Sequence, residues 1–403
     1  MNAKSTPTAR RYDLDWLRVL AILSVFVYHS TRFFNLGDWH VKNAVTYVWV
    51  QLWDNFATTW LMPFIFVISG ASLYFAMEKG GFAKFLKDKV LRLLVPLLVG
   101  AFTHASLQVY LERLTHGQFS GSYFEFLPHY FQGVYMEGDP AAGNFAFAGM
   151  HLWYLMFLFM FVLVLYPVFR GLKTKGGQAV LAKIGGFLAL PGAMYLLAIP
   201  LILIDDHVNG FIVEITPGGW GMAFYMWFLL AGFILISHAG LQERIRRMRW
   251  ISLTGAILLS AGFLVIVVMG QYPAYAALSE SIDDLLRSFA SWFWIFSFLG
   301  FASQHLSFKT PFLKYANEAV LPFYILHQTV LLGLGYFVVQ WHIPDLLKWI
   351  IILTSSFPVI MGLYEYGVRR NNVLRFLFGM KPKEKAPASQ TVLQPAPSQA
   401  SSD

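Results

Sequence analysis

A histidine embedded in an apolar stretch is the residue in this sequence best suited to proton chemistry. His29 lies in the segment LRVLAILSVFVYHSTRFF, eleven residues after Arg18. In a helix this spacing places His29 about 16 Å further along the axis than Arg18. Imidazole has an unperturbed pKa near neutrality, which suits a general base. A histidine at this depth can also serve only structure, by bonding to a backbone carbonyl.

Two cations stand together where another apolar stretch begins. Lys89 and Arg92 precede the run LLVPLL and are one helical turn apart, so they are predicted to face the same way. Such a pair could bind a phosphate group. The alternative is that these charges only mark the end of a membrane span.

Four further residues carry polar or aromatic groups inside apolar segments. They are His151 and Trp153 at the start of one segment, and Tyr324 and His327 within another. As hydrogen-bond donors they are candidates for contacting substrate or stabilising an oxyanion. His151 and Trp153 could equally belong to an interfacial aromatic belt, and His327 to hydrogen bonding between helices.

The composition identifies the elements that must position these residues. The chain has 403 residues, of which 57% are hydrophobic and 13% charged, and it contains no cysteine. Soluble domains carry about 25% charged residues. The absence of cysteine excludes thiolate nucleophiles, disulfides and zinc–thiolate sites. We therefore expect an all-α, polytopic membrane protein.

About ten segments are long and apolar enough to cross a bilayer as helices. The predicted spans are 16–35, 56–77, 91–110, 151–169, 185–204, 220–238, 251–270, 287–304, 320–340 and 346–367. With both termini in the cytoplasm, 23 of the 30 Lys and Arg residues fall on the cytoplasmic side and 5 outside, while Arg18 and Arg92 stand at the inner helix ends. This asymmetry follows the positive-inside rule. The net charge of +8 is thereby explained by topology, and no nucleic-acid partner is expected.

The chain is predicted to contain one membrane domain between two polar tails. Residues 1–15 form a cytoplasmic N-terminal tail, residues 16–380 the helical domain, and residues 381–403 a disordered cytoplasmic tail rich in Pro, Ala, Ser and Gln. Deleting residues 382–403 is predicted to leave the protein functional.

Five short motifs resemble, in order, those of the acyltransferase 3 family of membrane O-acyltransferases. They are Leu14-Asp15-Trp16-Leu17-Arg18 with His29, Phe66-Val67-Ile68-Ser69-Gly70, Lys89/Arg92 before Leu93-Leu94-Val95-Pro96, His151-Leu152-Trp153-Tyr154, and Tyr324-Ile325-Leu326-His327. Within the family the chain looks most like the periplasmic-glucan succinyltransferase branch. That likeness is carried by Trp39-His40-Val41, His151-Leu152-Trp153, Tyr364-Glu365 and Leu374-Arg375-Phe376-Leu377-Phe378.

The resemblance implies an acyl-CoA-dependent transferase in a bacterial inner membrane. It would move an acetyl or succinyl group from cytoplasmic acyl-CoA, a co-substrate, to a hydroxyl of a periplasmic glucan or surface polysaccharide, without a resident cofactor or metal. His29 would be the catalytic histidine, with Arg18, Lys89 and Arg92 as ligands of the acyl-CoA headgroup. The family commonly has Arg-x-x-Arg where this chain has Lys89 and Arg92, and lysine lacks bidentate geometry.

Two other functions also account for histidines inside a membrane. A proton-coupled transporter or flippase of a glycan precursor would use them as a proton relay. A scaffold of an envelope-glycan assembly would not depend on His29 at all. The oligomeric state, and the choice between direct transfer and an acyl-histidine relay, stay open at this point.

Overall fold

The computed structural model describes residues 10–77, 81–136, 139, 141–208 and 220–383. Every regular element within these ranges is a helix, and the pairing between extended residues is limited to isolated bridges from Gly133 to Phe145. The all-α prediction is therefore confirmed. Most of both predicted tails, at 1–9 and 384–403, lies outside the described residues.

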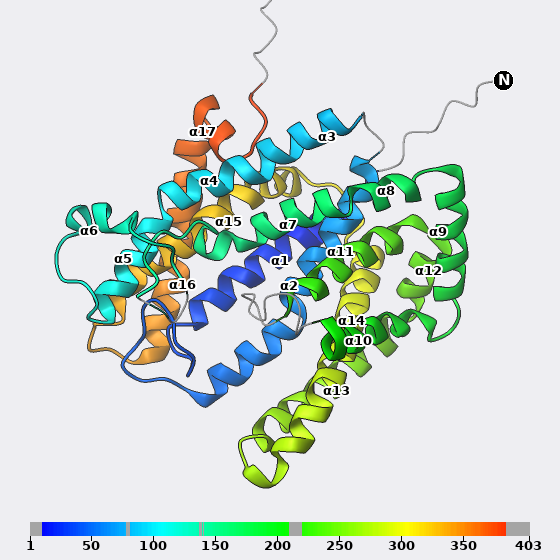
Figure 1. Cartoon of the computed structure of the whole chain (residues 1–403), viewed down its shortest axis with the longest axis horizontal. Helices are drawn as coiled ribbons and strands as arrows, with labels where there is room; N and C mark the ends of the chain where they lie inside the picture. Colours follow the sequence, from blue (N-terminus) through cyan, green and yellow to red (C-terminus); the bar gives the residue numbers. More distant parts are fainter. Residues whose placement is uncertain (1–9, 78–80, 137–138, 140, 209–219, 384–403) are drawn as a thin grey trace, which may run out of the picture.

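Figure 1 shows how the helices are arranged. In chain order they are α1 (Tyr12–Thr31), α2 (Val48–Ala76), α3 (Phe82–Lys89), η1 (Val90–Leu94), α4 (Val95–Phe102), α5 (Ala105–Thr115), α6 (Tyr123–Tyr130), η2 (Met150–Leu152), α7 (Trp153–Val164), α8 (Tyr166–Leu172), α9 (Lys175–Leu188), η3 (Ala193–Ala198), α10 (Ile199–Val208), α11 (Met222–Ser237), α12 (Ala239–Arg247), α13 (Arg249–Met269), η4 (Pro273–Tyr275), α14 (Ala276–His305), α15 (Pro311–Val338), α16 (Asp345–Gly362), η5 (Leu363–Val368) and α17 (Asn372–Leu377).

Helices α1 and α2 lie in the middle of the bundle, and the other long helices pack around them (Figure 1). Helix α1 contacts α2, α14, α15 and α16. Its apolar residues Leu17, Val25 and Phe26 are buried, as are Asp13 and Asp15 in its first turn. A helix surrounded on several sides is well placed to carry a site that must be shielded from lipid.

Two glycines allow α2 and α11 to approach each other closely. A Cβ added to Gly70 would lie 1.9 Å from the backbone oxygen of Leu229, and one added to Gly232 would lie 2.1 Å from that of Val67. Small residues at such contacts are how membrane helices gain van der Waals packing where lipid removes the hydrophobic driving force. The glycine of the Phe66–Gly70 motif therefore has a packing role.

Several predicted spans are bent. The pair α9 and η3–α10 turns by 114°, and α11 and α12 turn by 101°. The predicted span 185–204 crosses the first of these bends, because α9 ends at Leu188 and Gly192 follows Pro191 with a left-handed φ of +80°. Proline and a left-handed glycine both terminate a helix. The sequence predicted one continuous helix over 185–204. That prediction is wrong, because the helix ends at Leu188 and the chain bends.

The number of membrane crossings is bounded by the lengths of the apolar helices. Among the described residues, five helices are long and apolar enough to cross a membrane, and up to nine do so if each bent pair counts as one span. Helix α1 is outside that count, since Asp13, Asp15 and Arg18 lie in its first two turns. The figure of about ten spans and the cytoplasmic location of both termini stay predictions.

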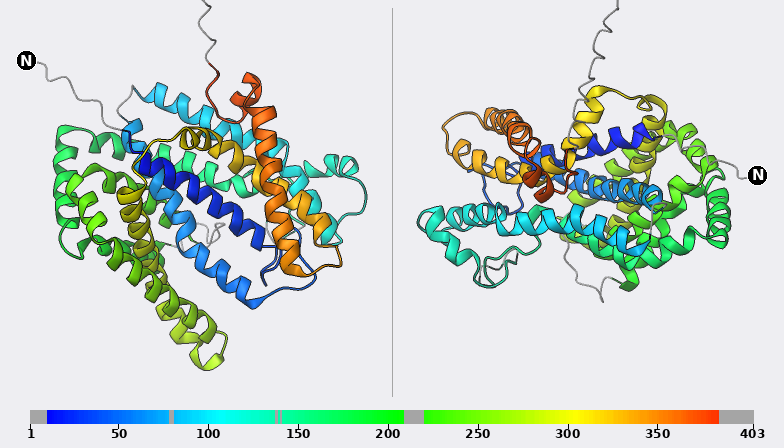
Figure 2. Two further views of the ribbon diagram at one scale, coloured as in Figure 1. Left: turned by 180° about the vertical axis from the view of Figure 1, so that it is seen from behind. Right: turned by 90° about the horizontal axis from the view of Figure 1, so that it is seen from above.

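The hairpin of α13 and α14 projects from one side of the bundle (Figures 1 and 2). In the most apolar 18-residue stretch of α13, only 22% of the residues are buried within the protein. Exposed side chains on α13 include Ile257, Leu258 and Val265. An exposed helix that is apolar on its outer surface is typical of a membrane protein.

Candidate functional site

The centre of the site is a pair of histidines from α1 and α15. Nδ1 of His29 lies 3.1 Å from Nε2 of His327 and 3.1 Å from the carbonyl oxygen of Val25. Nδ1 of His327 lies 2.6 Å from the carbonyl oxygen of Tyr324. The fold thus brings together two histidines that are 298 residues apart in the sequence.

These contacts assign the tautomers of both rings. A carbonyl oxygen can only accept, so the proton of His327 lies on Nδ1 and is donated to Tyr324. Nε2 of His327 then carries a lone pair, which accepts the Nδ1 proton of His29. This assignment leaves Nε2 of His29 unprotonated. His327 is fully buried, whereas His29 keeps part of its surface exposed.

His151 and Tyr324 tie the start of α7 to α15. Nε2 of His151 lies 3.1 Å from the carbonyl oxygens of both Tyr324 and Ile325. The Tyr324 hydroxyl donates to the carbonyl oxygen of His151. His327 likewise donates to the carbonyl oxygen of Tyr324. The hydrogen-bond donors of His151, Tyr324 and His327, three of the four predicted oxyanion candidates, are therefore all engaged within the protein.

The two tryptophans near the site pack differently. Trp153 is buried among Phe66, Phe157 and Tyr225, with ring centroids 5.4–6.5 Å apart. It therefore belongs to the aromatic core between α2, α7 and α11. Trp39, in the loop between α1 and α2, stacks on His29 at 6.3 Å with an interplanar angle of 18°.

A lysine holds this loop over the end of α1. The Lys42 ammonium donates to the carbonyl oxygens of Arg32, Asn35 and Gly37 at 2.7–2.9 Å, and to the Asn35 side chain at 2.6 Å. Burial, followed by the nearby Arg32 charge, lowers the pKa of Lys42 to about 8. The loop is thus an ordered cover above His29.

Arg18 lies at the other end of α1 and keeps part of its surface exposed. Its guanidinium donates to Asp15 at 3.2 Å, to Asn317 at 3.0 Å and to Ser72 at 2.8 Å. Its side chain is 33% exposed. Groups on α1, α2 and α15 therefore fix its direction, and part of the guanidinium side chain stays exposed.

A cleft runs from Arg18 towards Tyr324. It encloses about 570 Å³ of free space, a volume that includes its open mouth. The polar groups in its lining are Arg18, Ser69, Tyr154 and Tyr324, and Leu93 and Leu321 are among its apolar residues. Tyr324 connects this cleft to the histidine pair, because its carbonyl oxygen accepts from His327.

The predicted cation pair stands beside this cleft. Lys89 and Arg92 do not line it, although Leu93, the next residue of the same turn, does. Arg92 contacts Asp88 at 3.1 Å with a side chain 45% exposed, whereas Lys89 is 13% exposed and lies 5.2 Å from the ring centre of Phe85. The chain forms a π-helix from Val90 to Leu94, a distortion often found at functional sites.

A buried polar network surrounds the histidine pair on the side away from Arg18. Gln108 donates to Thr329 at 2.6 Å and lies 3.3 Å from Nδ1 of His151. Gln328 donates to Gln108 at 3.1 Å and lies 3.1 Å from Nε2 of His40.

His40 completes the network. It pairs through Nδ1 with Glu112, which also accepts from Tyr135 at 2.9 Å. The network thereby joins two loops to α15 beside His327.

Sequence reasoning missed most of this network. Gln108 and Gln328 are uncharged, and Glu112 lies just beyond the predicted span 91–110, although helix α5 includes it. The signal that could have found Gln328 was its position directly after His327, since a second buried polar residue in one turn needs a partner.

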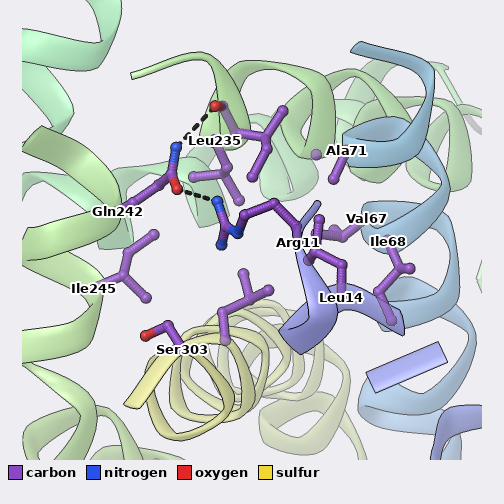
Figure 3. A pocket seen from close by; sticks show the side chains of 12 residues that line it. Arg11, Leu14, Val67, Ile68, Ala71, Leu235, Gln242, Ile245 and Ser303 are labelled. Carbon is purple, nitrogen blue, oxygen red and sulfur yellow. Dashed lines mark hydrogen bonds between the residues drawn. The ribbon is translucent and has the colours of Figure 1, made fainter. Parts of the chain in front are cut away.

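A second cleft, enclosing about 430 Å³ of free space, lies between the start of α1 and helices α2, α11, α12 and α14 (Figure 3). Its wall is mostly apolar. Arg11, the charged residue in the wall, donates to Gln242 and to both oxygens of Asp13. No predicted site residue lines this cleft. Within the described ranges, no three His, Asp or Glu side chains are arranged to hold a metal ion.

The chain is similar to known proteins over almost its full length. The family model described as "Acyltransferase domain" (acyltransferase 3) matches residues 11–365. The chain is 24% identical to the protein named "Glucans biosynthesis protein C" of Salmonella typhimurium, over 96% of this chain and 99% of that one. It is also 24% identical to the protein of that name in Salmonella typhi, over 94% and 97%. No solved structure matches. The protein with this histidine pair is thus a member of the acyltransferase 3 family.

Proposed function

We propose that the protein transfers a short acyl group, succinyl or acetyl, from acyl-CoA to a hydroxyl of an extracytoplasmic glycan, with His29 as the general base. Family membership supports acyl transfer over a transporter. The acceptor class is suggested by the relatives' name, glucans biosynthesis protein C. Inner-membrane localisation belongs to the same proposal.

The observation that carries the role of His29 is its hydrogen bond to His327. Nδ1 of His29 donates to His327 at 3.1 Å, so Nε2 is available to accept a proton. When it does, the ring becomes an imidazolium and the bond from Nδ1 becomes charge-assisted, which strengthens it. An interaction that strengthens as the proton is transferred favours the transition state over the ground state.

The cleft supports the binding of an extended donor. Arg18 and the nearby Arg92 and Lys89 would attract the phosphates of acyl-CoA, and the apolar walls would accommodate the narrow pantetheine arm. The thioester would then arrive beside Tyr154 and Tyr324, next to the histidine pair. Donor and acceptor would approach the reacting centre from opposite ends of α1.

The proposed step conserves all atoms without another reactant. Nε2 of His29 removes the proton of the acceptor hydroxyl while its oxygen attacks the thioester carbonyl carbon. The carbon–sulfur bond then breaks, and the thiolate of CoA receives the proton from the imidazolium. An acyl-histidine relay would instead form a bond from His29 to the acyl carbon.

Tyr154 is our candidate for stabilising the oxyanion. The Ser69 hydroxyl donates to the carbonyl oxygen of Ile65 at 2.8 Å, so Tyr154, 2.6 Å from Ser69, donates to it. Rotating that one hydroxyl proton would aim it into the cleft. The donors of His151, Tyr324 and His327 would each have to leave a backbone carbonyl oxygen.

The test uses purified protein in lipid nanodiscs with an acyl-CoA and a glucan acceptor. We expect release of free CoA thiol and a mass increase of the glucan equal to one acyl group. His29→Ala should abolish both signals while the protein keeps its elution volume and melting temperature. Acyl transfer at the wild-type rate by folded His29→Ala would overturn the proposal.

A further inference from the structure

The C-terminal segment Asn371–Lys383 packs against the turn that carries Arg92. After α17, Gly379 adopts a left-handed φ of +67°. A Cβ added there would lie 2.9 Å from the backbone oxygen of Arg92 and 2.8 Å from the Pro96 ring. Only glycine both tolerates this φ and leaves space for that contact.

The turn that Gly379 contacts has a weakened hydrogen-bond ladder. In an α-helix the carbonyl oxygen of Arg92 would accept from the amide of residue 96, but that residue is proline and has no N–H. The neighbouring residues Val90–Leu94 form a π-helix. Since the ladder is interrupted here, packing from outside the helix has more influence on where the turn lies.

A buried arginine fixes the C-terminal segment to α15. Arg375 donates to Glu318 at 2.8 Å and to the backbone oxygen of Lys381 at 2.7 Å, and its side chain is 8% exposed. Leu321, one turn after Glu318, lines the cleft and would lie 3.1 Å from a Cβ at Gly379. The C-terminal segment, α15 and the Arg92 turn therefore meet where Leu321 and Leu93 line the cleft. Figure 1 shows α17 near α4.

We infer that the segment Asn371–Lys383 is a positioning element of the donor site, which holds the Arg92 turn beside the cleft and so sets the affinity for the phosphates of acyl-CoA. This inference rests on the proposed function. Gly379 and Arg375 are positioning residues in it, since they act through Arg92 and need not touch the donor.

The test compares Gly379→Ala with a matched control in the full-length protein. Gly117 has nearly the same φ, +68°, but a Cβ there would meet nothing within 4 Å. Both substitutions impose the same backbone strain, and only Gly379→Ala displaces Arg92. Binding of free CoA is measured by calorimetry in nanodiscs, and KM and kcat are measured with acyl-CoA.

We expect Gly379→Ala to weaken CoA binding about 10-fold, the loss of one charge-assisted contact, and to raise KM for the donor with kcat unchanged. Gly117→Ala should leave CoA binding unchanged. Because Gly379 acts through Arg92, combining Gly379→Ala with Arg92→Ala should weaken binding no further than Arg92→Ala alone.

Each other outcome has a definite meaning. If Arg92→Ala leaves CoA binding unchanged, the donor site of the proposed function is wrong. If Arg92→Ala weakens binding and Gly379→Ala does not, only the positioning role is overturned. If Gly379→Ala does not fold, the test uses Arg375→Gln. This substitution removes the ion pair with Glu318 and loosens the segment without adding an atom beside Arg92, so it should raise the donor KM. An unchanged KM there would overturn the inference.

Discussion

Replacing His327 tests whether the histidine pair acts as a unit. His327→Leu keeps a side chain of similar size but removes one of the two acceptors that face the Nδ1 proton of His29. His327→Gln replaces the lone pair of Nε2 with an amide oxygen that can accept the same proton. The Val25 carbonyl oxygen, also 3.1 Å from Nδ1, still favours the same tautomer of His29 in both variants.

The magnitude follows from how the bond changes during the reaction. A neutral hydrogen bond contributes about 1 kcal/mol and one to a charged group about 1.5–3 kcal/mol. The difference of about 0.5–2 kcal/mol is the part that lowers the barrier, which corresponds to roughly a 2- to 30-fold loss of kcat in His327→Leu. His327→Gln should stay within about 3-fold of wild type, because its oxygen still accepts from the imidazolium.

The assay is release of CoA thiol at saturating donor and acceptor, with the donor KM measured alongside. KM should not change, since His327 is fully buried and does not line the cleft. Wild-type kcat in folded His327→Leu would refute the reasoning. So would an equal loss in the leucine and glutamine variants, because the effect would then come from packing and not from the lone pair.

Four further outcomes are expected. Arg18→Ala should raise the donor KM about 10-fold in the same thiol assay, through loss of a cation beside the phosphates; an unchanged KM would exclude Arg18 from donor binding. Tyr154→Phe should lower kcat at least 10-fold by removing an oxyanion donor, whereas Ser69→Ala should have a smaller effect; equal effects would contradict that role. Gly70→Val should cost more than about 3 kcal/mol, seen as loss of folded protein in size-exclusion chromatography, because its Cβ would collide with the Leu229 backbone; normal yield would contradict the close contact. Deleting residues 384–403 should leave kcat and KM unchanged, whereas deleting 371–403 should raise the donor KM; equal behaviour of the two truncations would contradict the role of the C-terminal segment.

The sequence predicted the helical class because periodicity and hydropathy are local properties of the chain. It could not predict the bend at Pro191–Gly192 within the expected span 185–204, since proline and glycine also occur inside continuous membrane helices. Nor could it show that Leu93, and not Arg92, lines the cleft, because the π-helix at Val90–Leu94 changes which residues face inward.

The candidate site shows the same division between local and long-range information. Spacing from Arg18 placed His29 near the far end of α1, but it could not reveal that Nδ1 of His29 faces His327 as well as the Val25 carbonyl oxygen. This contact joins two residues that are 298 positions apart, so it depends on the folded structure. The tautomers also depend on the direction of each hydrogen bond. Both nitrogens of His327 are engaged in the structure, which favours a role in orienting the proposed base over donation to an oxyanion. Sequence can therefore indicate which residues to test, while the chemical role proposed for each histidine depends on the partner of each of its nitrogens.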